Sequence, residues 1–100
     1  MSDHADSREF TLKKPLKQGD GFLKTITLSE PLAMHMEAAE KLATAEGKGT
    51  MTLNGMIIHL MALSSGQNPQ TIRQLSARDF MEMRGYLNSF LDGSLPTGES

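Results

Sequence analysis

Residues 10–31 read FTLKKPLKQGDGFLKTITLSEP and hold the pattern that decides the fold. Apolar and polar side chains alternate on both sides of residues 17–21, KQGDG, whose two glycines are typical of a turn. The segment therefore predicts an antiparallel β-hairpin with one apolar face. Because a lone hairpin is only marginally stable in water, the rest of the chain must cover that face. The alternating apolar residues are Phe10, Leu12, Leu16, Phe22, Ile26 and Leu28.

The residues after the hairpin predict two long helices. Ser29 and Pro31 are typical of a helix start, so the first helix is expected over about 30–45. The second is expected over about 52–64, with Thr50 or Thr52 as its cap. The first helix carries an apolar stripe of Leu32, Met36, Ala39, Leu42 and Ala43. The apolar arc of the second is broader and consists of Leu53, Met56, Ile57, Leu60, Met61 and Leu63.

Two further helical segments are expected toward the C-terminus. Asn68 and Pro69 open a short turn through Gln74. Ser76 with Asp79 three residues later indicates the start of a helix over about 77–91, which residues 92–93 end. We therefore predict an α+β fold, an N-terminal antiparallel β-hairpin followed by three to four helices. The apolar pattern covers residues 9–92 as one domain, with flexible tails at 1–8 and 93–100.

The length and composition indicate one ordinary globular domain. The chain has 100 residues, 38% hydrophobic and 22% charged, and no cysteine, which excludes disulfide scaffolds and thiolate chemistry. Its formal net charge of -2 does not favour a phosphate-backbone binder, which usually has a basic excess. The apolar run at residues 56–58, which His59 interrupts, is too short for a membrane span, and the first six residues are polar and acidic. We expect neither a transmembrane helix nor a signal peptide.

The residues that carry chemistry are scattered along the chain. His4, His35 and His59 have no second ligand at metal spacing, and residues 47–50, GKGT, lack the preceding strand and first glycine of a phosphate loop. We therefore expect no enzyme, no metal and no cofactor. Residues 68–91 allow one alternative, a small helix-turn-helix-like DNA-binding regulator, although the two arginines of the last helix are opposed by acids.

Apolar residues outside the predicted helix stripes indicate a surface for a protein partner. Met34, Ile58 and Met81 lie off these stripes, and methionine side chains adapt to varied partners. Single exposed apolar residues are common, so scattered surface positions remain the alternative interpretation. The candidate partner-binding residues are Met34, Ile58, Met81 and, as an anchor, Tyr86.

The order of these motifs resembles the small tail assembly chaperones of long-tailed bacteriophages and prophages, of the Mu-like and P2-like kind. The resemblance rests on FTLKKPL, the turn KQGDG, FLKTITLSEP and the closing segment ALSSGQNPQTIRQLSARDFMEMRGYLNSFL. It covers roughly residues 9–92. The middle segment, KLATAEGKGTMTLNGMI, has no pattern that matches the family.

The resemblance implies a non-enzymatic assembly factor in the bacterial host cytoplasm that is not retained in the mature virion. It implies binding to the tape-measure protein, a long, largely helical and apolar rod, which is kept soluble until the tail tube forms. In some relatives a frameshifted, extended form recruits the tail-tube protein, and residues 94–100 would tolerate such an extension. No nucleic-acid or membrane partner is expected. A homo-oligomer and a minor structural tail component stay open.

Overall fold

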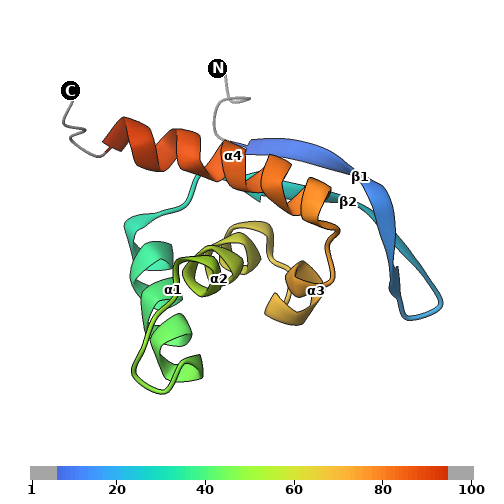
Figure 1. Ribbon diagram of the computed structural model, residues 1–100. Helices are drawn as coiled ribbons and strands as arrows, with labels where there is room; N and C mark the ends of the chain where they lie inside the picture. Colours follow the sequence, from blue (N-terminus) through green and yellow to red (C-terminus); the bar gives the residue numbers. More distant parts are fainter. Residues whose placement is uncertain (1–6, 95–100) are drawn as a thin grey trace.

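The structure, a computed structural model, describes residues 7–94, with side chains described as far as Leu91. A two-stranded antiparallel hairpin precedes four helices, which confirms the predicted α+β fold class (Figure 1). Of the tails expected at 1–8 and 93–100, residues 1–6 and 95–100 lie outside the described residues, whereas residues 7–8 and 93–94 belong to the first strand and the last helix. The elements are β1 Ser7–Gln18, β2 Gly21–Ser29, α1 Ala33–Glu46, α2 Leu53–Ser65, α3 Pro69–Arg73 and α4 Ala77–Ser94.

The hairpin is tighter at its turn and less regular along its length than its sequence predicts. Gln18 pairs with Gly21, so only two residues form the loop. Between the pairs Thr11–Thr25 and Leu16–Leu23, β1 advances by five residues while β2 advances by two. This irregularity changes which β2 residue faces inward. Phe22, predicted on the apolar face, is 63% exposed, whereas Leu23 packs against the core.

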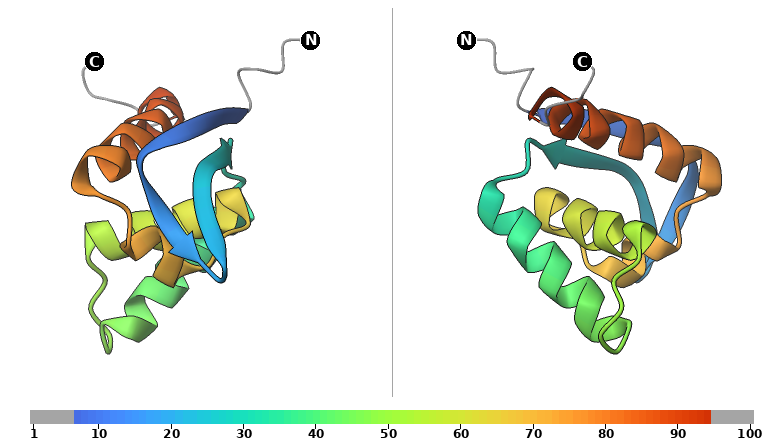
Figure 2. Two further views of the ribbon diagram at one scale, coloured as in Figure 1. Left: turned by 90° about the vertical axis from the view of Figure 1, so that its right-hand side faces the viewer. Right: turned by 60° about the vertical axis from the view of Figure 1, so that its left-hand side comes forward.

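The core lies between the inner face of the hairpin, α2 and α4. Helix α2 is central, because it contacts α1, α3, β2 and α4. In the views of Figure 1 and Figure 2 it lies between α1 on one side and the hairpin with α4 on the other. Each large apolar side chain fully buried there contributes about 1.5–3 kcal/mol to the stability of the folded chain. The largest fully buried residues are Leu28, Ile57, Leu60, Met61, Ile72, Met83 and Leu87.

Helix α1 packs on α2 through small residues rather than through the broad stripe that its sequence predicts. Ala39 and Ala43 are its only buried residues, and a Cβ added to Gly55 of α2 would lie 3.7 Å from the Cβ of Ala43. Such small side chains allow the two helix backbones to approach closely. Leu32 and Leu42, both predicted on the buried stripe, are 55% and 44% exposed.

The start of α1 also differs from its prediction. Ser29 pairs with Ser7 at the end of β2 and therefore does not cap the helix. The N-cap is Leu32, whose backbone N–H donates to Nδ1 of His35 at 3.1 Å. Because an apolar N-cap offers no acceptor of its own, the imidazole of His35 satisfies one donor at this helix end.

The starts of the other three helices confirm the predicted caps. The side-chain oxygens of Thr52, Asn68 and Ser76 accept backbone N–H bonds at 3.0, 2.8 and 3.2 Å. Two other predictions, the extent of the apolar arc of α2 and the end of α4, were wrong. Leu53 and Leu63, placed on the apolar arc of α2, are 57% and 37% exposed. Helix α4 does not end at residues 92–93 but continues to Ser94.

Candidate functional site

Exposed apolar side chains concentrate on the helical hairpin formed by α1 and α2. Among the described residues eight large apolar side chains are exposed, and six of these lie between Leu32 and Leu63. Single exposed apolar residues are normal on a protein surface, so their concentration in one stretch of the chain is the feature that stands out. The six are Leu32, Met34, Leu42, Met51, Leu53 and Leu63; Phe22 and Met81 are the other two.

One side of α1 carries an apolar stripe that does not face α2. Met34, Ala38, Leu42 and Ala45 follow one another at intervals of four, four and three residues, so they share one side of the helix. Met34, Leu42 and Ala45 are exposed and Ala38 is half-buried. We call these four residues the α1 stripe. Its position follows from the packing of α1, since the alanines at 39 and 43 occupy the side that meets α2.

A second apolar feature is a groove of about 290 Å³ between α2, α3 and α4. Ile72 and Leu75 lie at its buried base, and the half-buried side chains of Ile58 and Phe80 line it as well. This volume is at the lower limit of small-molecule pockets, which measure about 300–1,000 Å³. The groove therefore has room for one or two side chains of a partner. Its lining is completed by Asn54, Arg73 and Ala77.

Three helices meet in a polar cluster beside the groove. Glu46, at the end of α1, accepts a hydrogen bond from Arg73 Nη2 at 2.6 Å, and its Oε1 lies 2.9 Å from Nε2 of the buried His59. These contacts from His59 and Arg73 lower the pKa of Glu46 below its ordinary value. The cluster joins α1, α2 and α3 and holds the guanidinium of Arg73 at the groove wall.

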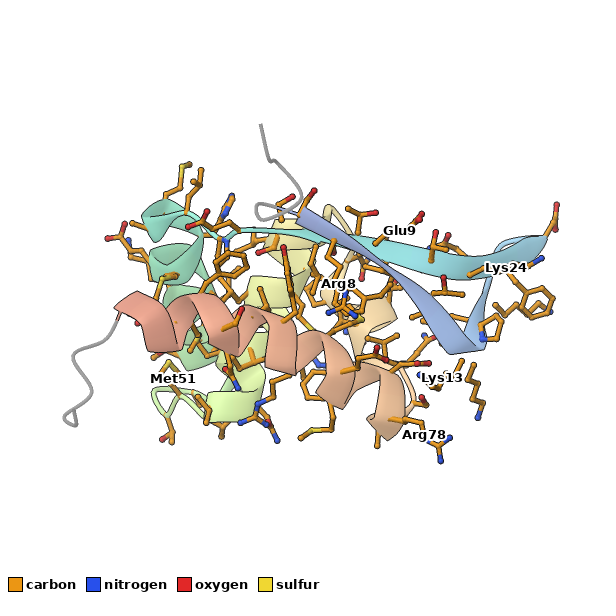
Figure 3. All side chains as sticks on the ribbon, turned by 90° about the horizontal axis from the view of Figure 1, so that it is seen from above. Arg8, Glu9, Lys13, Lys24, Met51 and Arg78 are labelled. Atoms are coloured by element: carbon orange, nitrogen blue, oxygen red, sulfur yellow. The ribbon has the colours of Figure 1, made fainter. Side chains whose placement is uncertain are left out.

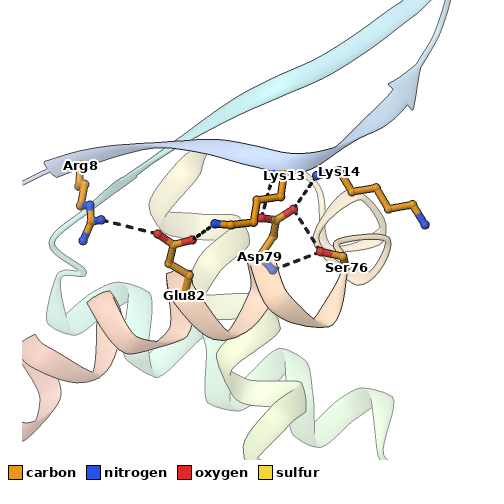
Figure 4. A network of polar contacts seen from close by, with 6 residues as sticks. All are labelled: Arg8, Lys13, Lys14, Ser76, Asp79 and Glu82. Carbon is orange, nitrogen blue, oxygen red and sulfur yellow. Dashed lines mark hydrogen bonds and ion pairs between the residues drawn. The ribbon is translucent and has the colours of Figure 1, made fainter.

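Helix α4 directs its charged side chains to opposite sides. Asp79 and Glu82 turn toward β1, where Glu82 lies 3.2 Å from Lys13 Nζ and 3.8 Å from Arg8 Nη2 (Figure 4). Arg84 instead donates to Asn54 Oδ1, in the groove lining, at 3.0 Å. Arg78 points away from the sheet (Figure 3) and forms no ion pair within the described part of the chain. Among the described residues, neither Arg78 nor Arg84 forms an ion pair with an acid.

Asp79 anchors this arrangement. Its side chain accepts from the backbone N–H groups of Lys13 and Lys14 at 3.0 and 3.1 Å and from Ser76 Oγ at 3.1 Å. Burial alone would raise the pKa of Asp79, but the hydrogen bonds from Lys13, Lys14 and Ser76 lower it overall. Asp79 was predicted to pair with Ser76 at the start of α4, and the two residues do bond to each other. The bonds of its carboxylate to the irregular part of β1 were not predicted.

The four predicted partner-binding residues lie on three helices. Met34 (66% exposed) belongs to the α1 stripe, and Met81 (56% exposed) lies on α4. Ile58 is half-buried and lines the groove. Because Met81 follows Ala77 by four residues, it lies on the side of α4 that borders the groove. Tyr86 is half-buried, with ring centroids 5.6 Å from Phe10 and 5.1 Å from Phe90, so it packs within the body of the protein.

Sequence reasoning did not select several residues of these surfaces. Leu42 was assigned to the core, although the small size of its neighbours Ala39 and Ala43 is a signal for the close helix contact that leaves it outside. Phe80 and Arg73 line a groove that exists only because three helices meet, and no local spacing indicates that meeting.

The described residues do not gather in a metal-binding or membrane-spanning arrangement. No three histidine or acidic side chains among them could hold a metal ion together. Within the same part of the chain, none of the helices combines the length and the apolar character needed to cross a membrane.

The fold and its surfaces define a class of small α+β protein, a hairpin with four helices and an exposed apolar surface on α1 and α2. A family model described as "Phage tail assembly chaperone proteins, E, or 41 or 14" matches residues 9–92. Because the match covers most of the chain, this protein belongs to the phage tail assembly chaperone family. No curated protein and no solved structure matches the chain.

Proposed function

We propose that this chaperone binds the tape-measure protein of a phage tail and keeps it soluble until the tail tube forms around it. The single observation that carries the proposal is the concentration of six exposed apolar side chains between Leu32 and Leu63, four of them within α1 and α2, in a member of the chaperone family. A helical rod with unburied apolar stripes aggregates in water unless another surface covers them. The role is one of binding and needs no reaction.

The α1 stripe is suited to such a client. Met34 and Leu42, eight residues apart, lie on the same side of the helix about 12 Å apart along its axis. An amphipathic helix of the client would pack along this stripe and exclude water from both surfaces. Methionine is unbranched and flexible, so the same position accommodates different client side chains.

The proposal extends to the place and time of action. The chaperone acts in the cytoplasm of the bacterial host and leaves the tape-measure protein as the tube assembles, so it is absent from the mature virion. A frameshifted, extended form would contact the tail-tube protein as well. Mass spectrometry of purified particles tests the absence, because a minor structural tail component would be found in every particle.

The decisive experiment is co-expression of the tape-measure protein with this chain. The soluble fraction of the tape-measure protein should rise markedly with the wild-type chain. It should fall back to the level without chaperone for Met34→Glu and Met81→Glu, which place charges on exposed apolar positions. These positions are well exposed, so circular dichroism should remain unchanged.

A matched control comes from the hairpin. Phe22 is 63% exposed, like Met34, but lies on β2 next to the turn. Phe22→Glu adds the same charge and should still solubilise the tape-measure protein. If the wild-type chain leaves the tape-measure protein insoluble, the proposed function is wrong. If the Met34→Glu and Met81→Glu variants solubilise the tape-measure protein as well as the wild-type chain does, the binding surface lies elsewhere.

A further inference from the structure

We infer that the groove between α2, α3 and α4 is a docking site for a protein helix that carries an apolar side chain flanked by acidic residues. The inference rests on the proposed function, because it names the chemistry of one segment of the client. It concerns a different surface from the α1 stripe. The groove offers an apolar base, Ile72 and Leu75, below the half-buried Ile58 and Phe80.

The charge around the groove selects the flanking residues of the occupant. Arg73 lines the groove, and Arg84 bonds to its lining residue Asn54. Among the described residues, Glu46 is paired with Arg73, whereas Arg84 has no ion pair with an acid. The acids of α4 itself, Asp79 and Glu82, are engaged with β1 (Figure 4). An apolar groove beside the unneutralised Arg84 is complementary to an acidic partner.

The held positions of two arginines strengthen the site. Arg73 is fixed by Glu46 at 2.6 Å, and Arg84 by Asn54 at 3.0 Å. Both guanidinium groups retain N–H donors beyond these single bonds, because each carries five. A carboxylate on the occupant therefore meets donors whose side-chain freedom is already restricted, which reduces the entropy lost on binding.

The size and shape of the groove favour side chains of a helix over a small molecule. Its volume of about 290 Å³ takes one or two apolar side chains. Met81 lies on the bordering side of α4 and is 56% exposed, so it extends the apolar contact beyond the groove. A helix that inserts one anchor into the groove would cover Met81 with the next turn.

Two labelled synthetic peptides of about 18 residues test the inference on the full chain. Both carry the same leucines at helical spacing, and the flanking positions are glutamate in one and lysine in the other. Fluorescence anisotropy at low salt should show at least about tenfold tighter binding of the acidic peptide, and added salt should reduce the difference. Equal binding of the two peptides overturns the inference.

Variants locate the site. Ile58→Glu should weaken the binding of the acidic peptide by about tenfold or more. Phe22→Glu, which adds the same charge away from the groove, should leave this binding unchanged. Since Ile58 is half-buried, Arg84→Glu provides a second test outside the core, and Arg78→Glu, on an arginine that does not line the groove, is its matched control. Arg78→Glu should keep the preference for the glutamate peptide, whereas Arg84→Glu should remove it. An unchanged preference in Arg84→Glu overturns the inference.

A second copy of the chain is the competing occupant. Analytical ultracentrifugation separates the cases: if the wild-type chain is a dimer that Ile58→Glu turns into a monomer, the groove is a self-interface and the inference is wrong. Failure of the inference and failure of the proposed function are distinguishable. If Ile58→Glu still solubilises the tape-measure protein as wild type does, the groove has no role although the chaperone function stands. If the wild-type chain binds the acidic peptide but does not solubilise the tape-measure protein, the proposed function fails.

Discussion

The carboxylate of Asp79 on α4 accepts a hydrogen bond from the backbone N–H of Lys13 on β1 at 3.0 Å, across 66 residues of sequence. The next N–H, that of Lys14, donates to the other carboxylate oxygen at 3.1 Å. These two donors lie in the irregular part of β1, where the strand has no regular pairing with β2. A buried acid on one element thus replaces a missing partner strand on another and fixes α4 to the hairpin.

Replacement of this acid should be costly. Asp79→Asn keeps the shape but turns one acceptor into a donor, which then faces a backbone N–H in a site that is 2% exposed. An unsatisfied buried donor costs about 1–3 kcal/mol, so the free energy of unfolding in urea should fall by that amount. Glu82→Gln is the control. Its ion pairs with Arg8 and Lys13 are exposed, so it should cost less than about 1 kcal/mol. An equal loss of unfolding free energy in both variants would show that the buried hydrogen bonds of Asp79 contribute no more than the exposed ion pairs of Glu82.

The same carboxylate should make the stability depend on acid pH. Because the pKa of Asp79 is lowered in the folded chain, the unfolded chain binds this proton first as the pH falls. The contribution is therefore complete above the ordinary value of 3.8 and is lost as the pH falls from there through the lowered value. The difference in unfolding free energy between wild type and Asp79→Asn should shrink over this range. Urea titrations from about pH 6 down to pH 2 measure it, and a constant difference would contradict the assignment.

Two glycines should respond to alanine in opposite directions. Gly85 lies exposed within α4, and an added Cβ meets no atom within 4 Å, so Gly85→Ala should stabilise the chain by about 0.5–1 kcal/mol. At Gly47, between α1 and α2, an added Cβ would overlap the backbone carbonyl oxygen of Thr50. Gly47→Ala should therefore cost at least about 1 kcal/mol. Thermal melts of both variants decide this, and a stabilised Gly47 variant would mean that the loop moves freely.

The local parts of the fold could be predicted from sequence because their causes are local. Thr52, Asn68 and Ser76 cap helices through bonds to residues two or three positions away, and such bonds are visible as spacing. The carboxylate oxygens of Asp79 accept from donors 65 and 66 residues away, and such distant pairs cannot be predicted from local sequence spacing. Local spacing therefore predicted the pairing of Asp79 with Ser76 but not its bonds to β1.

The candidate surfaces likewise combine features that local sequence predicted with features that depend on tertiary packing. Met34 and Met81 lie off the predicted stripes and are exposed, as periodicity indicated. Leu42 and Ala43 are adjacent and both lie on the predicted stripe of α1, yet only Ala43 is buried. Periodicity gives the side of a helix that is apolar, but the closeness of α2 selects the smaller residue for the contact. The groove combines three helices, so its lining could not be predicted from any single segment.

A comparison of two methionines tests this sorting of apolar residues directly. Met83 on α4 is fully buried, whereas Met34 on α1 is 66% exposed. Met83→Ala leaves a cavity in the core and should lower the free energy of unfolding by about 2–5 kcal/mol. Met34→Ala removes the same atoms from a wet surface and should change it by no more than about 0.5 kcal/mol. Urea denaturation of both variants, with client solubilisation measured in parallel, separates stability from binding. A loss of solubilisation in Met34→Ala at unchanged stability assigns this side chain to the client surface, while a large loss of stability there would place it in the core.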